Sequence, residues 1–123
     1  MHDTNASSIS ALNSKTSTKV GAFAPASGFT ASEVKVYQTG NVCFINFYVT
    51  KSSAIGGSEI NIGAISGIAL PSAGIRCQCA SGTYAYNAVH PAYAYISTNG
   101  NINVLLTSSS DTVVVFCVSY IVR

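Results

Sequence analysis

The pattern of hydrophobic and polar positions is that of a β-protein from about Val20 onward. Short runs rich in Val, Ile, Tyr and Phe are separated by clusters of Gly, Ser, Thr and Asn, as expected of an all-β sandwich or barrel. We therefore predict an all-β, antiparallel fold. The strands are expected over residues 33–38, 42–50, 60–65, 75–80, 93–98, 102–106 and 112–122.

The predicted strand over residues 42–50 shows the alternation most clearly. Its odd-numbered positions are apolar and should face a core, namely Cys43, Ile45, Phe47 and Val49. Its even-numbered positions should lie on the opposite face, and include Phe44, Asn46 and Tyr48. The strand therefore has one face suited to a core and a second face that mixes aromatic and polar groups.

Two short segments predict tight turns between strands. Thr39-Gly40-Asn41 should lead directly into the strand over residues 42–50. Asn99-Gly100-Asn101 lies between two predicted strands, and Asn-Gly favours a type I′ turn because both residues tolerate positive φ. The second segment therefore predicts a β-hairpin.

The predicted last strand, over residues 112–122, is apolar on both faces. Val113, Val115, Cys117 and Ile121 point one way, whereas Val114, Phe116, Val118, Tyr120 and Val122 point the other. A strand that is apolar on both faces has to be covered on both. One face should meet the core, and a second copy of the chain is the simplest cover for the other. A loop of the same chain packed over this face is the alternative.

The first 20 residues differ from the rest of the chain and are interpreted as the end of a stalk or a linker, with the β-domain over residues 21–123. Residues 6–15 could form a short helix with Ile9 and Leu12 on one face. The polar start, from Met1 to Ser8, lacks the basic and apolar regions of a signal peptide. The longest apolar run is about half the length of a membrane-spanning helix, so we expect no membrane insertion.

Charged residues make up only 8% of the chain, against about 25% in typical domains. A surface so poor in charge favours association with other molecules. The net charge of +2 is scattered, without the basic stripe that nucleic acids require, so we expect no nucleic-acid partner. The four cysteines lie in apolar, strand-like segments, and we expect them to be buried reduced thiols.

The candidates for catalysis and metal binding are few, and we expect neither an enzyme nor a cofactor or metal site. The acidic residues are Asp3, Glu33, Glu59 and Asp111, and no two are spaced as an acid–base pair. A Ser-His-Asp or Cys-His arrangement built on His90 stays open at this point. Cys77 and Cys79 could ligate a soft metal with His90, but the second cysteine pair of a structural zinc site is absent.

One segment, residues 81–95, has the amino-acid composition of a ligand-binding surface. It carries tyrosines separated by small residues, together with an amide and an imidazole. Tyrosine rings stack on sugar rings, and amide and imidazole groups bond to hydroxyls. The candidate ligand-binding residues are Tyr84, Tyr86, Asn87, His90 and Tyr93. The alternative is that these tyrosines are ordinary strand residues that pack a sheet face.

The order of these features resembles the C-terminal head domain of a bacteriophage tail fibre or receptor-binding protein. The resemblance covers most of residues 20–123 and rests on the pattern of predicted strands and turns, without a fixed catalytic motif. The segments that carry it are Ile9–Thr16, Gly28–Ala31, Val34–Val49, Ile62–Ile65 with the Pro71 loop, Ala94–Val104 and Val118–Val122.

The resemblance implies a homotrimeric, jelly-roll-like β-sandwich head at the tip of a fibre. Its role would be adhesion to a host bacterium through a surface saccharide, without catalysis and without a cofactor. Such a protein is made in the bacterial cytoplasm without a signal peptide and ends in the phage tail. The alternatives are a purely structural trimerisation module of a fibre or virion, and a carbohydrate-binding module.

Overall fold

The structure, a computed structural model, describes residues 17–122. It contains nine β-strands and one short 3-10 helix, η1 (Ala85–Asn87). The strands are β1 (Thr18–Val20), β2 (Ala22–Pro25), β3 (Phe29–Thr39), β4 (Val42–Lys51), β5 (Ile60–Ser66), β6 (Ile75–Gly82), β7 (His90–Ile96), β8 (Asn101–Leu106) and β9 (Val113–Ile121).

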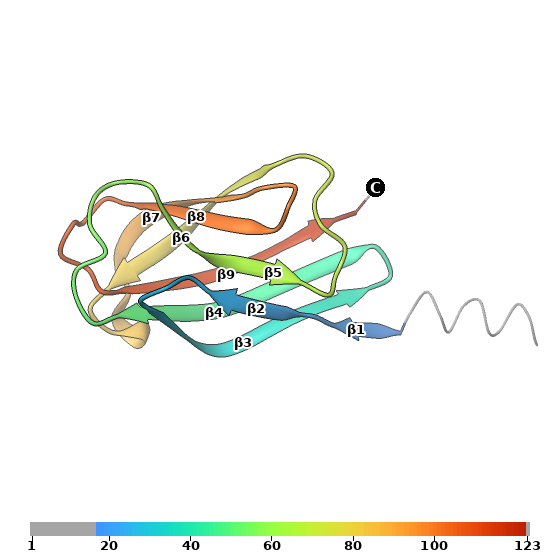
Figure 1. The fold of residues 1–123 in the computed structure, drawn as a ribbon, viewed down its shortest axis with the longest axis horizontal. Helices are drawn as coiled ribbons and strands as arrows, with labels where there is room; N and C mark the ends of the chain where they lie inside the picture. Colours follow the sequence, from blue (N-terminus) through green and yellow to red (C-terminus); the bar gives the residue numbers. More distant parts are fainter. Residues whose placement is uncertain (1–16, 123) are drawn as a thin grey trace, which may run out of the picture.

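All nine strands belong to one antiparallel sheet, in the order β1-β3-β4-β9-β6-β7-β8-β5-β2. The sheet folds over on itself, so that β1, β3, β4 and β9 form one layer and β6, β7, β8, β5 and β2 the other (Figure 1). The backbone N–H of Gly21 donates to the carbonyl of Val36 at 2.7 Å, which brings β2 close to β3. The molecule is therefore a nearly closed, sandwich-like barrel, and the predicted all-β antiparallel fold is confirmed.

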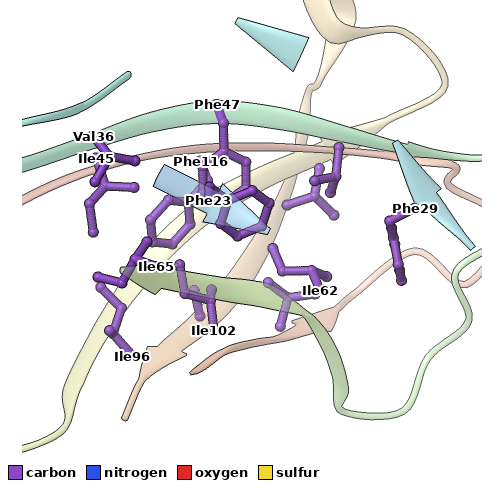
Figure 2. Close-up of a cluster of buried hydrophobic side chains, with 14 of the residues drawn as sticks. Phe23, Phe29, Val36, Ile45, Phe47, Ile62, Ile65, Ile96, Ile102 and Phe116 are labelled. Carbon is purple, nitrogen blue, oxygen red and sulfur yellow. The ribbon is translucent and has the colours of Figure 1, made fainter. Parts of the chain in front are cut away.

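The hydrophobic core fills the space between the two layers. Phe23 of β2 stacks on Phe47 of β4 with ring centroids 4.0 Å apart, and Phe47 in turn stacks on Phe116 of β9 at 5.1 Å. Figure 2 shows these three rings beside isoleucines such as Ile65 and Ile102. The predicted core face of β4 is confirmed, because its four odd-numbered apolar side chains are all buried.

The connections between strands gather at the two ends of the barrel. Residues 26–28, 52–59, 83–89 and 107–112 lie at one end, and β1 lies at the opposite end (Figure 1). The C-terminal end of β9 also lies at the β1 end. We call the end that carries residues 83–89 the loop end.

The predicted strands are all present, although the sequence pattern missed β1 and β2 and the first four residues of β3. β1 pairs with β3 through Thr18 to Val20, so the sheet begins within the segment interpreted as stalk or linker. The boundary at residue 20 stays a prediction. The helix proposed for residues 6–15 lies outside the described residues.

The two predicted turns differ in their outcome. Gly40 and Asn41 connect the paired residues Thr39 and Val42, and Gly40 has a φ of 61°, so the tight turn is confirmed. The second turn is not of type I′, because that type needs positive φ at both central residues and only Gly100, at 91°, has it. Ser97 instead closes a four-residue connection, in which its carbonyl accepts from the N–H of Gly100 at 3.0 Å.

The outer face of β9 is only partly covered within the described chain. Val113 is buried, and Val115 is half-buried beneath η1. η1 is thus a packed loop of the kind that the alternative predicted, but it covers only the beginning of the strand. Further along, Cys117 is exposed, and Ile121 keeps 60% of its surface exposed. The outer face of β9 is therefore open to solvent from Cys117 onward, and its cover by a second copy stays a prediction.

The four cysteines are all free thiols, but the expectation that all four are buried is wrong. Cys43 lies in the core, Cys77 and Cys79 are half-buried against it, and Cys117 is exposed on the outer face of β9. The outer face of β9 is apolar in sequence yet open to solvent, so an apolar neighbourhood in the sequence did not ensure burial there.

Candidate functional site

Three of the five candidate residues lie in the connection between β6 and β7, at the loop end. Tyr84, Tyr86 and Asn87 are exposed there, and Tyr86 keeps 89% of its surface accessible. The two tyrosine rings stack on each other, with centroids 5.6 Å apart and an interplanar angle of 20°. The connection therefore presents a pair of ordered aromatic rings to solvent. We call Tyr84, Tyr86, Asn87 and His90 the tip cluster.

The connection holds its shape because its backbone lies close against β6. The N–H of Asn87 donates to the carbonyl of Tyr84 at 3.1 Å, which closes the single turn of η1. A side chain at Gly82 would lie 2.6 Å from the carbonyl oxygen of Asn87, so only glycine allows this close approach. Gly82 therefore fixes η1 against the end of β6.

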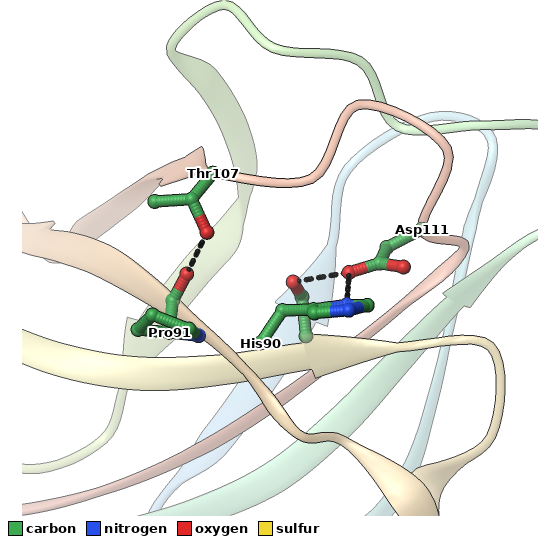
Figure 3. Close-up of polar contacts among 5 residues, drawn as sticks. His90, Pro91, Thr107 and Asp111 are labelled. Carbon is green, nitrogen blue, oxygen red and sulfur yellow. Dashed lines mark hydrogen bonds and ion pairs between the residues drawn. The ribbon is translucent and has the colours of Figure 1, made fainter.

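His90, the fourth candidate, is held by a buried carboxylate. Its Nδ1 lies 2.8 Å from Oδ2 of Asp111, and Ser81 Oγ donates to the same oxygen at 2.7 Å (Figure 3). Asp111 is only 2% exposed, whereas about half of the His90 side chain is exposed. The contact at Nδ1 fixes the orientation of the ring and leaves Nε2 for a hydrogen bond to a ligand. His90 is thus an oriented hydrogen-bonding group at the edge of the tip cluster.

This network does not have the geometry of a nucleophilic catalytic site. Ser81 is buried, and its hydroxyl donates to Asp111 rather than to His90. A serine nucleophile has to be within hydrogen-bond reach of its base. Ser81, Asp111 and His90 therefore form a structural anchor for the histidine in this arrangement.

A hollow of about 350 Å³ lies below Tyr86, on the outer face of the first layer. Tyr86 forms one wall, and Glu33, Asn46, Tyr48 and Val115 contribute to the remainder. Glu33 belongs to a β-bulge in β3 and has a φ of 54°. The tip cluster thus continues into a concave surface that combines aromatic, amide and carboxylate groups.

Tyr93, the fifth candidate, is separated from the tip cluster. Alternation along β7 buries Ala92, Ala94 and Ile96 in the core and directs Tyr93 outward, where 52% of its surface is exposed. His90 instead reaches Asp111 at the loop end. The five candidates therefore belong to two different surfaces.

The residues that support the candidates were not recognised in the sequence. Asp111 and Ser81 lie 21 and 9 positions from His90, and no sequence motif links them to it. The register that pairs Ser81 with His90 could have suggested their contact, since the two strands are adjacent along the chain. Glu33 and Tyr48 gave no signal, because only the folding of η1 over β4 brings them near Tyr86.

Within residues 17–122, no three or more His, Cys, Asp or Glu side chains cluster closely enough to hold a metal ion. No helix in this part of the chain has the length and apolar character needed to cross a bilayer.

Comparison with known proteins finds a similar fold but no sequence match. No protein-family model and no curated protein matches the sequence. The structure is similar to the crystal structure of the receptor binding protein of Listeria phage PSA, with a TM-score of 0.68 and 17% sequence identity. The similarity covers 99% of this chain and 75% of that one. The resemblance to phage receptor-binding proteins is therefore confirmed at the level of the fold.

Proposed function

We propose that this chain is a phage tail-tip attachment domain that recognises a saccharide on the surface of a host bacterium. The observation that carries the proposal is the stacked and exposed pair of Tyr84 and Tyr86 at the loop end. A tyrosine face offers a planar apolar surface to a sugar ring, and its conformational entropy cost is low. The similar fold of a phage receptor binding protein supports the same role.

The position of the tip cluster fits attachment. β1 enters the sheet at the end opposite to the loop end (Figure 1). If the residues before β1 are the end of a stalk, the tip cluster faces away from that stalk and toward a host surface. His90 adds a fixed hydrogen-bonding group for a sugar hydroxyl, and Asn87 adds an exposed amide. In this proposal the protein is a component of the virion tail and acts by binding alone.

The proposal includes a homotrimer. The outer face of β4 and β9 carries the exposed apolar side chains of Val42, Phe44 and Ile121, and few charges interrupt them. Contiguous apolar surface of this kind marks interaction sites in soluble proteins. Packing against copies of itself would provide the cover that most of the outer face of β9 lacks.

The test is the labelling of bacterial cells and of immobilised cell-wall saccharides by the fluorescent full chain. We expect Tyr86→Ala and Tyr84→Ala each to weaken binding about tenfold or more, since stacking residues in binding sites are commonly hot spots. Val20→Ala, an exposed apolar change in β1, is the matched control and should bind as the wild type does.

Stability has to be measured alongside, because His90→Ala removes a donor from the buried Asp111. We expect that change to cost about 1–3 kcal/mol of unfolding free energy, so Tyr86→Ala is the decisive variant. Wild-type binding by both tyrosine variants would contradict the tip cluster as the site. If the wild-type chain assembles but labels no strain and no saccharide, a purely structural fibre module is the better description.

A further inference from the structure

A second surface of the molecule lies on the outer face of β6, β7 and β8. Arg76 of β6 pairs with Tyr95 of β7, which pairs with Asn103 of β8. One step along the strands, Gln78 pairs with Tyr93, and Tyr93 pairs with Leu105. Because paired residues lie on the same face of a sheet, these six side chains form two adjacent rows across three strands. We call this surface the β7 platform.

The β7 platform is open to solvent and slightly concave. Tyr93 is 52% exposed and Leu105 is 40% exposed, and a hollow of about 160 Å³ lies over them. Within residues 17–122, no hydrogen bond satisfies the hydroxyl of Tyr93 or that of Tyr95. An aromatic ring beside an exposed leucine, with unpaired polar groups around them, is a surface suited to a sugar ring.

Arg76 is the only cationic residue of the platform, and its guanidinium is held in place. It lies over the ring of Tyr95, 5.0 Å from the ring centroid. In the described part of the chain it has neither an ion-pair partner nor a hydrogen-bond acceptor. A guanidinium stacked in this way keeps its N–H donors at the edge, where they can bind a carboxylate or phosphate in two parallel hydrogen bonds.

The amides next to Arg76 are also ordered. Asn61 of β5 donates to the side-chain oxygen of Asn103 at 3.0 Å, and to the carbonyl of Ile102 at 3.2 Å. With its oxygen engaged by Asn61, Asn103 keeps its own amide N–H groups for a ligand. The platform thus presents donors beside an apolar centre.

We propose that the β7 platform binds an anionic saccharide, with the sugar ring on Tyr93 and Leu105 and its acid group on Arg76. This site is separate from the tip cluster and goes beyond the proposed function. Asn103 and Gln78 provide hydrogen bonds to the hydroxyls. The charge that selects the ligand is that of Arg76.

One acidic side chain, Glu59, also borders the hollow, next to β5. Arg76 lies on β6, and β7 and β8 separate the two groups. Three strand spacings separate the backbones of the two residues by about 14 Å. Within residues 17–122 Glu59 forms no ion pair with Arg76, so the guanidinium is available to an anion, and Glu59 can accept hydrogen bonds from the far end of a saccharide.

The test is a titration of the nitrogen-15-labelled full chain, followed through its amide chemical shifts. The probes are glucuronate, glucose 1-phosphate and neutral glucose, so that a carboxylate and a phosphate are distinguished from each other and from an uncharged sugar. We expect saturable shifts at Arg76, Gln78, Tyr93 and Asn103, with at least one charged sugar bound about tenfold more tightly than glucose.

Two variants with the same change of charge provide the control. Arg76→Gln should weaken binding of the charged sugar about tenfold, whereas Lys35→Gln, on the outer face of the other layer, should leave it unchanged. Equal binding of glucose, an unchanged affinity in Arg76→Gln, or shifts confined to residues 83–90 would each overturn the proposal. Failure here leaves cell labelling through Tyr86 unaffected, so the two proposals are tested separately.

Discussion

Asp111 is the side chain on which the loop end depends most. Its carboxylate accepts from Ser81 and His90, and its backbone carbonyl accepts from the N–H of Ile55 at 2.9 Å. One residue thereby joins two connections, the end of β6 and the beginning of β7. A buried carboxylate without such donors would be costly, so these hydrogen bonds specify a single arrangement of the loop end.

Cys79 makes a prediction about alkaline pH. Burial, reinforced by the neighbouring Cys77, raises the pKa of the Cys79 thiol from 9.0 to about 12. The unfolded chain therefore loses this proton before the folded chain does, and ionisation favours unfolding. The free energy of unfolding should be independent of this group below pH 9 and should fall as the pH rises from 9 toward about 12.

The measurement is urea denaturation of the wild type and of Cys79→Ala at neutral pH and at about pH 10.5. The alkaline loss of stability should be smaller in Cys79→Ala. It should not vanish, since burial also raises the pKa of the Cys77 thiol and that of the Tyr120 hydroxyl. Cys117→Ala, at an exposed position, should keep the wild-type loss. An identical loss in Cys79→Ala would contradict the prediction.

At the scale of the element, the bulge in β3 carries a local cost. Glu33 has a φ of 54°, the one positive φ of a non-glycine residue within residues 17–122. At such a position glycine is less strained than any residue with a Cβ. We expect Glu33→Gly to be more stable than Glu33→Ala by about 1 kcal/mol, measured by urea denaturation.

Lys35 provides the matched control for the bulge. It is exposed on the same strand, where it pairs with Asn46 and has an ordinary extended backbone. There the order should reverse, with Lys35→Ala more stable than Lys35→Gly by about 0.5–1 kcal/mol. The same order at both positions would show that the bulge is not strained.

Sequence alternation predicted the strands well because burial has a period of two along a β-strand. β4 illustrates this, since its alternate side chains are buried as expected. β1 and β2 were missed because they are short and largely exposed, so their patterns carry little hydrophobic signal. The turn at Gly100 was assigned to the wrong type because two hairpin geometries accept the same glycine.

The candidate site was predictable only in part, for a physical reason. Tyr84, Tyr86 and Asn87 are neighbours in sequence, so their place in one connection could be predicted from the local sequence. Tyr93 was grouped with them because it is also close in sequence, but alternation along β7 directs Tyr93 to the outer face of the sheet. The anchoring of His90 by Asp111, and of Tyr95 beside Arg76, depends on strand pairing across the sheet, which composition does not reveal.

At the scale of the whole molecule, the two outer faces differ in chemistry. The face of β4 and β9 exposes Val42, Phe44 and Ile121. The face of β6 to β8 mixes tyrosines with amides and Arg76. The exposed apolar side chains of the first face are suited to assembly, and the mixed polar and aromatic side chains of the second are suited to ligand binding.

We expect the full chain to be a trimer in solution, with three times the chain mass of 12.7 kDa by light scattering behind size-exclusion chromatography. Ile121→Lys should dissociate it, because a charge on the interface would lose its hydration when the copies pack. Leu105→Lys, at an exposed apolar position on the opposite face, is the control and should stay trimeric. A single-chain mass for the wild type would contradict the interface.

The place of β9 in the sheet has a consequence for how the chain folds as it is synthesised. β9 follows the other eight strands in sequence, yet it lies between β4 and β6 and joins the two layers through strand pairing. Until the ribosome has delivered it, β4 and β6 keep open edges that can pair with other nascent chains. Folding of the sheet therefore has to wait for the synthesis of β9, and ribosome-bound chains that stop before Val113 should be the most prone to aggregate.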